Sequence, residues 1–372
     1  MREHIGMVVG KASPEERVEL AIEVAIVLIA AVLWIARPPA EFLQGFYAID
    51  FYPNVQNGFT RWTNQIPFAA GDLFCVLVIG AVILLWIVSL RRSRDRIAIG
   101  RLVLRTVAIA AFLYVWFLVA WGWNYDQDAL ARPLGYDAAA VQRWDVDALE
   151  DALVDALNAT APSAHMAHGA NPDTRARLRQ PYRDALPFLG VPEHVVLTRP
   201  KHTLLDPWFV ATGISGMFFP YTFETYLASD VLWFEYPFDL SHEWGHLAGV
   251  ARESDANFVG AVTTLRSPDP LIRYSGLILV YSAMPRIARH DARLSPLVQS
   301  DYNEMRRRNE RHIKPLAFKF AWNTYDRYLK SQHVASGVVN YTEYVSLLLG
   351  TDVGRAAIEK AVGKPLTPKS AQ

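Results

Sequence analysis

This sequence of 372 residues has one cysteine, no net charge and no long basic segment. The single cysteine, Cys75, leaves the chain without an internal disulfide, which is ordinary for an exported bacterial domain and less usual for a secreted animal protein. Lysine and arginine together number 37, as do aspartate and glutamate, so the formal net charge is zero. Because no extended polybasic patch is present, we expect no nucleic-acid partner.

Charged residues are absent from two long apolar segments in the first third of the chain, about residues 73–90 and 106–123. Each is long enough to cross a bilayer as a helix with little tilt. A third segment, about residues 20–36, contains Glu23, which would lie near the interface or face another helix. A cleavable signal peptide is the alternative for this segment, but no small-x-small cleavage site follows it. We therefore expect residues 1–123 to form a membrane domain with three transmembrane helices.

Basic residues predict the orientation of these helices. Six arginines lie in residues 91–105, between the second and third spans, whereas residues 37–68 contain only two arginines and no lysine. The positive-inside rule places residues 91–105 and the N-terminus in the cytoplasm, and residues 124–372 outside it. Residues 37–68 are then expected to be an outer loop that packs on the lipid headgroups or on the domain. Aromatic residues at the end of the third span fit an interfacial belt: Trp121, Trp123 and Tyr125.

The sequence His242-Glu243-Trp-Gly-His246 is a metal-binding pattern. Residues four apart share one helix face, so the two histidines can present their imidazoles to one ion. Glu243 lies one step around the helix, where it would reach a water on that ion. Two neutral nitrogens, one carboxylate and one open position define a catalytic zinc site. A chance match in a surface helix is the alternative, but the apolar residues 231–238 before the motif indicate a buried helix.

The ends of the motif helix and the third ligand follow from nearby residues. Asp239 could cap the helix and Gly249 could end it in a left-handed turn. Arg252, six residues after the second histidine, is always protonated and cannot coordinate a cation. The carboxylates near it are Glu253 and Asp255.

The spacing of Glu253 and Asn257 resembles the ligand helix of gluzincin-type peptidases, in which the glutamate binds zinc and the later residue orients a ligand histidine. The resemblance implies Glu253 as the third ligand and Asn257 as the residue that orients one imidazole through its other ring nitrogen. Asp255 is expected to point away into solvent.

Residues 124–372 are numerous enough for one sizeable core. Val146–Leu157 has the spacing of an amphipathic helix, and residues 163–171 are expected to be a loop of small residues. His165 and His168 in that loop form a His-x-x-His pair, for which a solvated loop is favoured over a second metal site. Further elements are expected as strands at 194–198 and 217–227 and as helices at 270–288, 298–330 and 341–362.

The expected strand at 217–227 lies just before the motif helix, and Pro220 suits an edge strand. In zincins an edge strand at this place holds extended substrate by main-chain pairing. Residues of this strand predicted to lie along the substrate are Phe219, Tyr221 and Phe223.

A donor to the developing oxyanion is also expected in a zincin. Tyr274 is predicted for this role, with Arg273 as the other candidate, because both fall on the helix after the ligand helix. The alternative is that Tyr274 is an aromatic residue of the core.

Stretches along nearly the whole chain resemble an uncharacterised bacterial family of three-span membrane proteins with a zincin-like domain. The resemblance implies a peptidase-like fold but no substrate, and it implies a glycine before Glu224, where this chain has Phe223. The stretches that carry it are residues 121–125, 213–216, 219–224, 241–258, 273–275 and 325–330, with Gly337 and Tyr341.

We therefore expect an α-helical membrane anchor followed by a mainly helical α+β zincin-like metallopeptidase domain. The predicted enzyme carries one Zn²⁺ ion, sits in the bacterial inner membrane as a multi-pass protein, and hydrolyses envelope or exported polypeptides with a zinc-activated water. The alternative is a non-catalytic sensor or assembly factor of the same fold that binds a protein partner. Glu243 favours the enzyme, because a carboxylate buried beside a metal is costly for a scaffold to keep.

Overall fold

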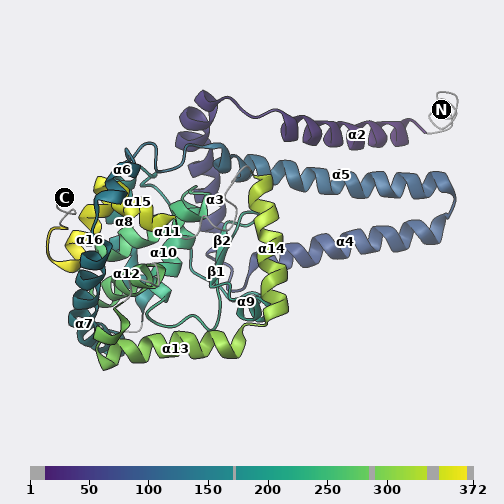
Figure 1. Cartoon of the computed structure of the whole chain (residues 1–372). Helices are drawn as coiled ribbons and strands as arrows, with labels where there is room; N and C mark the ends of the chain where they lie inside the picture. Colours follow the sequence, from purple (N-terminus) through teal and green to yellow (C-terminus); the bar gives the residue numbers. More distant parts are fainter. Residues whose placement is uncertain (1–12, 171–172, 285–289, 333–342, 367–372) are drawn as a thin grey trace.

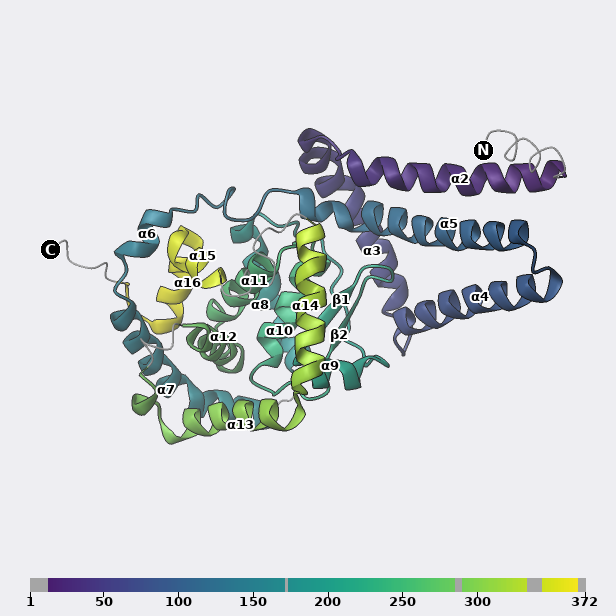
Figure 2. The same ribbon diagram turned by 45° about the vertical axis from the view of Figure 1, so that its right-hand side comes forward.

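The computed structural model describes residues 13–170, 173–284, 290–332 and 343–366. A mostly helical globular part occupies one end of the molecule, and three long helices project from it side by side (Figures 1 and 2). These are α2 (Pro14–Ile35), α4 (Ala70–Arg92) and α5 (Arg96–Ala120), each long and apolar enough to cross a membrane. The three expected spans are thereby confirmed as helices.

Two of the three candidate membrane-spanning helices, α2 and α5, begin at residues whose side chains cap them. Ser13 caps α2, since its hydroxyl accepts the Glu16 N–H and its own N–H donates to the Glu16 carboxylate. Asp95 caps α5 by accepting the N–H of Ala98, so this helix begins well before residue 106. Arg105 therefore lies within α5 and pairs with Glu23 of α2 at 2.9 Å. Glu23 was expected either near the interface or facing another helix, and in the structure it faces α5.

Residues 37–68 are mainly helical instead of forming a loop. They contain a π-helix, η1 (Phe42–Phe51), and the helix α3 (Tyr52–Thr63). The Tyr52 hydroxyl donates to the carbonyl oxygen of Leu247 at 2.9 Å, so this segment packs on the globular part. Tyr52 and Trp121 belong to the same core as the residues of the motif helix. The core therefore runs across residue 123, the expected domain boundary.

The core of the globular part surrounds α11 (Glu253–Leu265), all 13 residues of which are buried. Asp255 is among them, and its carboxylate accepts the N–H of Leu130 at 3.1 Å. The expectation that Asp255 is solvated is wrong, because helices cover α11 on every side. The other helices of this part are η2 (Gly122–Asp126), α6 (Ala138–Arg143), α7 (Val146–Ala170), α8 (Thr174–Leu189), α9 (Asp206–Thr212), α10 (Tyr236–Leu247), α12 (Pro270–Ala283), η4 (Asp291–Arg293), α13 (Pro296–His312), α14 (Pro315–Ser331), α15 (Tyr344–Gly350) and α16 (Asp352–Val362).

Several helices differ from their expected bounds. The predicted loop at 163–171 is wrong, since α7 continues through Pro162 to Ala170 and buries Ala161 and Ala164; residue 171 lies outside the described residues. The expected helix 298–330 is two helices, because Pro315 cannot continue α13 and instead begins α14.

Two helices of the C-terminal half also differ from the expected pattern. α12 ends at Ala283, while residues 285–288 of the expected element lie outside the described part of the chain. In the expected helix 341–362, residues 341–342 are likewise outside it, as are Gly337 and Tyr341 of the family-like stretches. The remainder is divided at Thr351, whose hydroxyl caps α16 by accepting the N–H of Gly354.

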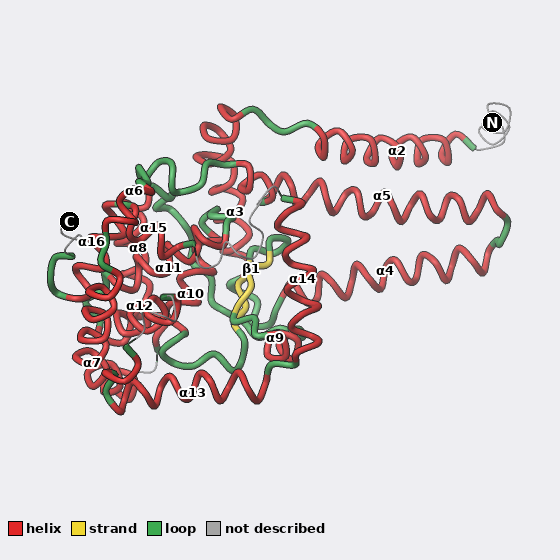
Figure 3. The backbone as a smooth tube through the Cα atoms, in the orientation of Figure 1, coloured by secondary structure: helices red, strands yellow, loops and turns green. Residues whose placement is uncertain are grey.

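The two strands form an antiparallel hairpin, β1 (Gly216–Phe219) and β2 (Glu224–Leu227), seen in yellow in Figure 3. The expected single strand 217–227 is wrong, because the chain turns at residues 220–223. Phe223 has a φ of +52°, a conformation that glycine adopts most easily, which agrees with the glycine implied at this position.

The expected strand at 194–198 is also wrong. This segment is extended, but side-chain amides of α3 satisfy its backbone in place of a neighbouring strand. Val196 donates its N–H to Asn57 at 2.8 Å and accepts a hydrogen bond from Gln56 at 2.9 Å.

Candidate metal centre

The turn between α10 and α11 brings the motif histidines to the start of the next helix. α10 begins at Tyr236 with Pro237 in its first turn, so Asp239 lies inside that turn and is not the N-cap that was expected. The helix ends at Leu247, and Gly249 follows with a φ of +96°, as expected. A Cβ at Gly249 would lie 3.1 Å from the Tyr52 ring, so a side chain there would press on that ring in addition to being strained by the positive φ. The chain then reverses and α11 begins with Glu253.

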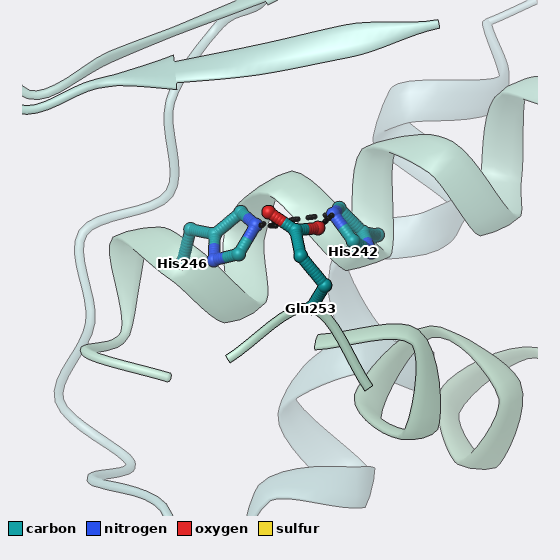
Figure 4. A group of neighbouring side chains, drawn as sticks. All are labelled: His242, His246 and Glu253. Atoms are coloured by element: carbon teal, nitrogen blue, oxygen red, sulfur yellow. Dashed lines mark hydrogen bonds and ion pairs between the residues drawn. The ribbon is translucent and has the colours of Figure 1, made fainter. Parts of the chain in front are cut away.

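Three potential ligand side chains converge at this turn (Figure 4). The Nε2 atoms of His242 and His246 are 3.1 Å apart. Oε2 of Glu253 lies 3.2 Å from the first of these nitrogens and 3.6 Å from the second. Within the described residues, these three form the one group of ligand-type side chains close enough together to hold a metal ion.

The outer nitrogens of both rings are hydrogen bonded to oxygens. Nδ1 of His242 lies 2.8 Å from Oδ1 of Asn257, and Nδ1 of His246 lies 2.7 Å from the carbonyl oxygen of Val250. A carbonyl oxygen only accepts, so the Nδ1 atoms carry the protons in the neutral rings. Both Nε2 lone pairs then face the same space. Asn257 thus contacts His242 in the way that the sequence predicted.

This geometry fits a tetrahedral metal ion. Zinc bonds of about 2.0–2.2 Å place the ligand atoms about 3.3–3.6 Å from one another, close to the three separations seen here. Two nitrogen lone pairs at 3.1 Å repel each other unless a proton or metal ion lies between them. Oε2 of Glu253 is buried and points to the same space, where it faces both Nε2 atoms. The donor set of two imidazoles and one carboxylate is one that zinc accepts in catalytic sites.

The electrostatics of the metal-free group favour a cation. Burial alone would lower the pKa of His246, but the Glu253 carboxylate reverses this and raises it to about 9. Burial likewise opposes ionisation of Glu253, yet the two histidines hold its pKa well below the usual range. Burial lowers the pKa of His242. The pKa shifts of His246 and Glu253 both favour positive charge at the place where the ligand atoms meet.

Glu243 lies beside the three ligand-type residues in an apolar cavity of about 300 Å³. Its Oε2 atom is buried without a hydrogen bond, and burial raises its pKa to about 8. A Cβ on Gly216 of β1 would lie 2.6 Å from Oε1 of Glu243, so only glycine allows the strand to pass this close. The cavity walls are largely aromatic: Trp121, Tyr125, Phe218, Phe219, Trp322, Tyr325 and Tyr328.

Tyr325 of α14 is a residue of the site that the sequence analysis did not assign. Its hydroxyl donates to Oε1 of Glu253, the oxygen that does not face the histidines. The residue also lines the cavity. In the sequence, its position in the family-like stretch 325–330 is the one sign that Tyr325 belongs to the site. The contact with Glu253 joins residues 72 positions apart, so local spacing does not predict it.

The predicted oxyanion donors do not reach the cavity. Tyr274 is fully buried and its hydroxyl donates to Asp301 at 2.5 Å, as a core aromatic would. Arg273 contacts the carbonyl oxygen of Ser267. His165 lies 2.9 Å from the same Asp301, and His168 stacks on an indole ring, so this pair is not arranged around a common ion.

The three predicted substrate-strand residues separate in the structure. Phe219 belongs to β1 and lines the cavity. Tyr221 lies in the hairpin turn and stacks on Phe74 of α4, with ring centroids 5.1 Å apart. Phe223 is fully buried against other aromatic rings. The structure therefore brings only Phe219 to the candidate site.

The fold and the site together define a mostly helical protein with three candidate membrane spans and one potential metal-binding group in its described part. Residues 47–349 match the profile of a family described as "Protein of unknown function (DUF3810)", and the chain belongs to that family. No curated protein and no solved structure matches the chain.

Proposed function

We propose that this protein is a membrane-anchored zinc metallopeptidase with a zincin-like globular domain. The observation that supports this most is the convergence of His242, His246 and Glu253 within 3.1–3.6 Å of one another, beside the buried carboxylate of Glu243. A structural zinc site would be closed by a fourth protein ligand. Here three ligand-type residues face an open cavity, which favours a catalytic site.

The two histidines and Glu253 would hold the ion, while Asn257 and the carbonyl of Val250 orient the rings. When bound, zinc lowers the pKa of a water molecule and polarises the scissile carbonyl group. Glu243 takes a proton from the attacking water and passes it to the leaving amine. Its buried position keeps its basicity high enough for this role, because desolvation disfavours the charged carboxylate.

Tyr325 is proposed as the donor to the developing oxyanion, in place of Tyr274. Its hydroxyl is already in the cavity, where it donates to the Glu253 carboxylate. A small rotation of the side chain would redirect this donor towards a substrate carbonyl. Preorganised donors of this kind stabilise tetrahedral transition states.

The strand β1 offers a place for extended substrate. It pairs with β2 along one edge, and in the described residues the sheet has no strand beyond β1. Gly216 lets the main chain of β1 pass directly beside Glu243. A peptide paired to this edge would therefore carry its main chain past the proposed general base. The aromatic walls of the cavity favour an apolar side chain next to the cleaved bond.

Four arginines gather where α4 ends and α5 begins: Arg91, Arg92, Arg94 and Arg96. They support a cytoplasmic N-terminus and a globular part outside the cytoplasm, in a bacterial inner membrane. The substrates would then be envelope or exported polypeptides. A reporter that works only in the cytoplasm, fused after residue 372, should be inactive; an active fusion would contradict this orientation.

Glu243→Gln is the test of the activity. The variant should keep its zinc and lose about 10²–10⁴-fold in turnover, because the glutamine side chain cannot take the proton. His242→Ala should lose the metal. The measurements are zinc content and the peptide profile of envelopes from cells with each form. Zinc bound to both forms with identical peptide profiles would instead support the non-catalytic sensor or assembly factor.

A further inference from the structure

An exposed apolar patch lies on α9, α14 and the residues just before α9. We define the α9–α14 patch as Leu204, Leu205, Trp208, Leu316 and Phe320. Three of these side chains are mostly exposed, at 75% for Leu204, 85% for Leu316 and 66% for Phe320. The rings of Trp208 and Phe320 meet edge to face with centroids 6.3 Å apart, so the patch is continuous between the helices. Clustered apolar exposure of this kind marks an interaction surface.

The patch is tied to the beginning of a membrane-spanning helix. Asp72 in the first turn of α4 accepts hydrogen bonds from the Thr203 hydroxyl at 2.6 Å and from the Leu204 N–H at 2.8 Å. Leu204 therefore lies level with the start of α4. In Figures 1 and 2, α9 and α14 lie at the end of the globular part from which α4 and α5 project. Both views show α14 running across the direction of these spans, as a helix lying in the membrane plane would.

The turn between β1 and β2 connects the ends of α4 and α5 nearest the globular part with the cavity. Tyr221 stacks on Phe74 near the start of α4, and its hydroxyl donates to the carbonyl oxygen of Leu113 in α5 at 3.4 Å. Leu113 is about 10 Å along the helix from its end at Ala120, by the rise per residue of an α-helix. The turn therefore packs on the sides of the spans, and Phe219 next to it lines the cavity.

The charges around the patch suit a lipid surface. Lys314 and Lys319 are exposed at the start of α14, where residues 314–320 include no acidic residue. On the α9 side of the patch, Asp206 accepts hydrogen bonds from the N–H and the hydroxyl of Ser229. Lysines beside exposed aromatic and aliphatic side chains are typical of helices that lie in the headgroup region of an anionic bilayer.

We propose that the α9–α14 patch inserts into the surface of the same bilayer that α2, α4 and α5 cross. The patch continues the apolar surface of the spans, since hydrogen bonds to Asp72 join it to α4. The opposite face of α14 supplies Trp322 and Tyr325 to the cavity. On the proposed peptidase function, substrates would thus reach the site along the membrane surface.

Spin labels attached to single cysteines test the insertion. The background is the full-length Cys75→Ser protein in vesicles of phosphatidylcholine and phosphatidylglycerol. Labels are placed at Leu204→Cys, Leu316→Cys and Phe320→Cys. The control is Asp352→Cys, whose side chain is 93% exposed on α16, away from the spans in Figures 1 and 2.

The measured quantity is the ratio of a label's collision rate with oxygen to its collision rate with a water-soluble nickel chelate. This ratio should be several-fold higher for labels in the patch than for the control label. A ratio equal to that of the control would overturn the proposal. Shielding from both reagents would also overturn it, because a protein partner or a second copy would then cover the patch. Leu316→Cys suffices if the other variants fold poorly, since its exposed side chain has little packing to lose. The labels report insertion whether or not the protein is a peptidase, so Glu243→Gln should give the same ratios.

Discussion

The side-chain oxygen of Asn257 lies 2.8 Å from Nδ1 of His242. These residues belong to consecutive helices, α10 and α11, and their contact turns the Nε2 atom of the imidazole towards Glu253 and His246. The ring orientation at the candidate metal centre therefore depends on how closely the two helices pack.

Asn257→Ala should weaken zinc binding by about 10–100-fold, the usual effect of removing a hydrogen bond that orients a ligand histidine. Competition with a zinc chelator measures the change. Asn303→Ala on the surface of α13 is the matched control and should bind zinc as the wild type does. Equal affinity in the two variants would show that Asn257 does not position the ring.

Tyr325→Phe should lower kcat by about 10²–10³-fold with zinc retained and KM little changed, because an oxyanion donor acts mainly in the transition state. Tyr274→Phe is the comparison, since that hydroxyl is bonded to Asp301 and the residue does not line the cavity. Steady-state kinetics on a fluorogenic peptide decide between them. Loss of kcat in the Tyr274 variant alone would restore the original prediction from the sequence.

Zinc binding to the metal-free protein should release a proton at pH 7. His246 has a pKa raised to about 9 by the Glu253 carboxylate, against the effect of burial, so it is protonated below that pH and must lose the proton to coordinate. The apparent affinity should therefore rise about tenfold per pH unit from pH 7 towards 9 and then level off. Calorimetry in buffers of different ionisation enthalpy counts the protons.

Proton release on zinc binding should also occur in Glu243→Gln, which keeps all three ligand residues and removes the other carboxyl group that lines the cavity. Binding at pH 7 without proton release would contradict the protonated His246.

Phe223→Ala should be more destabilising than Phe223→Gly. Both variants lose a buried ring that packs on Phe59 and Phe218, at a cost of about 3–5 kcal/mol. At a φ of +52°, however, only glycine avoids the left-handed strain of about 1 kcal/mol. Urea unfolding of the detergent-solubilised protein gives the two free energies. The reverse order would mean that the turn changes its conformation in the variants.

Local sequence was sufficient for the spans and for most of the candidate metal centre. The absence of charge over the length of a bilayer predicts a membrane-spanning helix, and all three predicted spans are helices in the structure. His242 and His246 share a face because they are one helical turn apart, and Gly249 permits the turn that brings Glu253 to them. Each of these relations spans few residues, so backbone periodicity and conformation determine it.

Tertiary packing decided the rest of the site. Tyr325 reaches Glu253, Trp121 donates its indole N–H to the carbonyl oxygen of His246, and Asp255 is buried against Leu130, all through contacts between distant segments. The hairpin that replaces the expected single strand likewise depends on Phe223 being held at a positive φ by surrounding aromatic rings. Such contacts arise from the way helices pack around α11, and no periodic pattern in the sequence encodes which side chains will meet there.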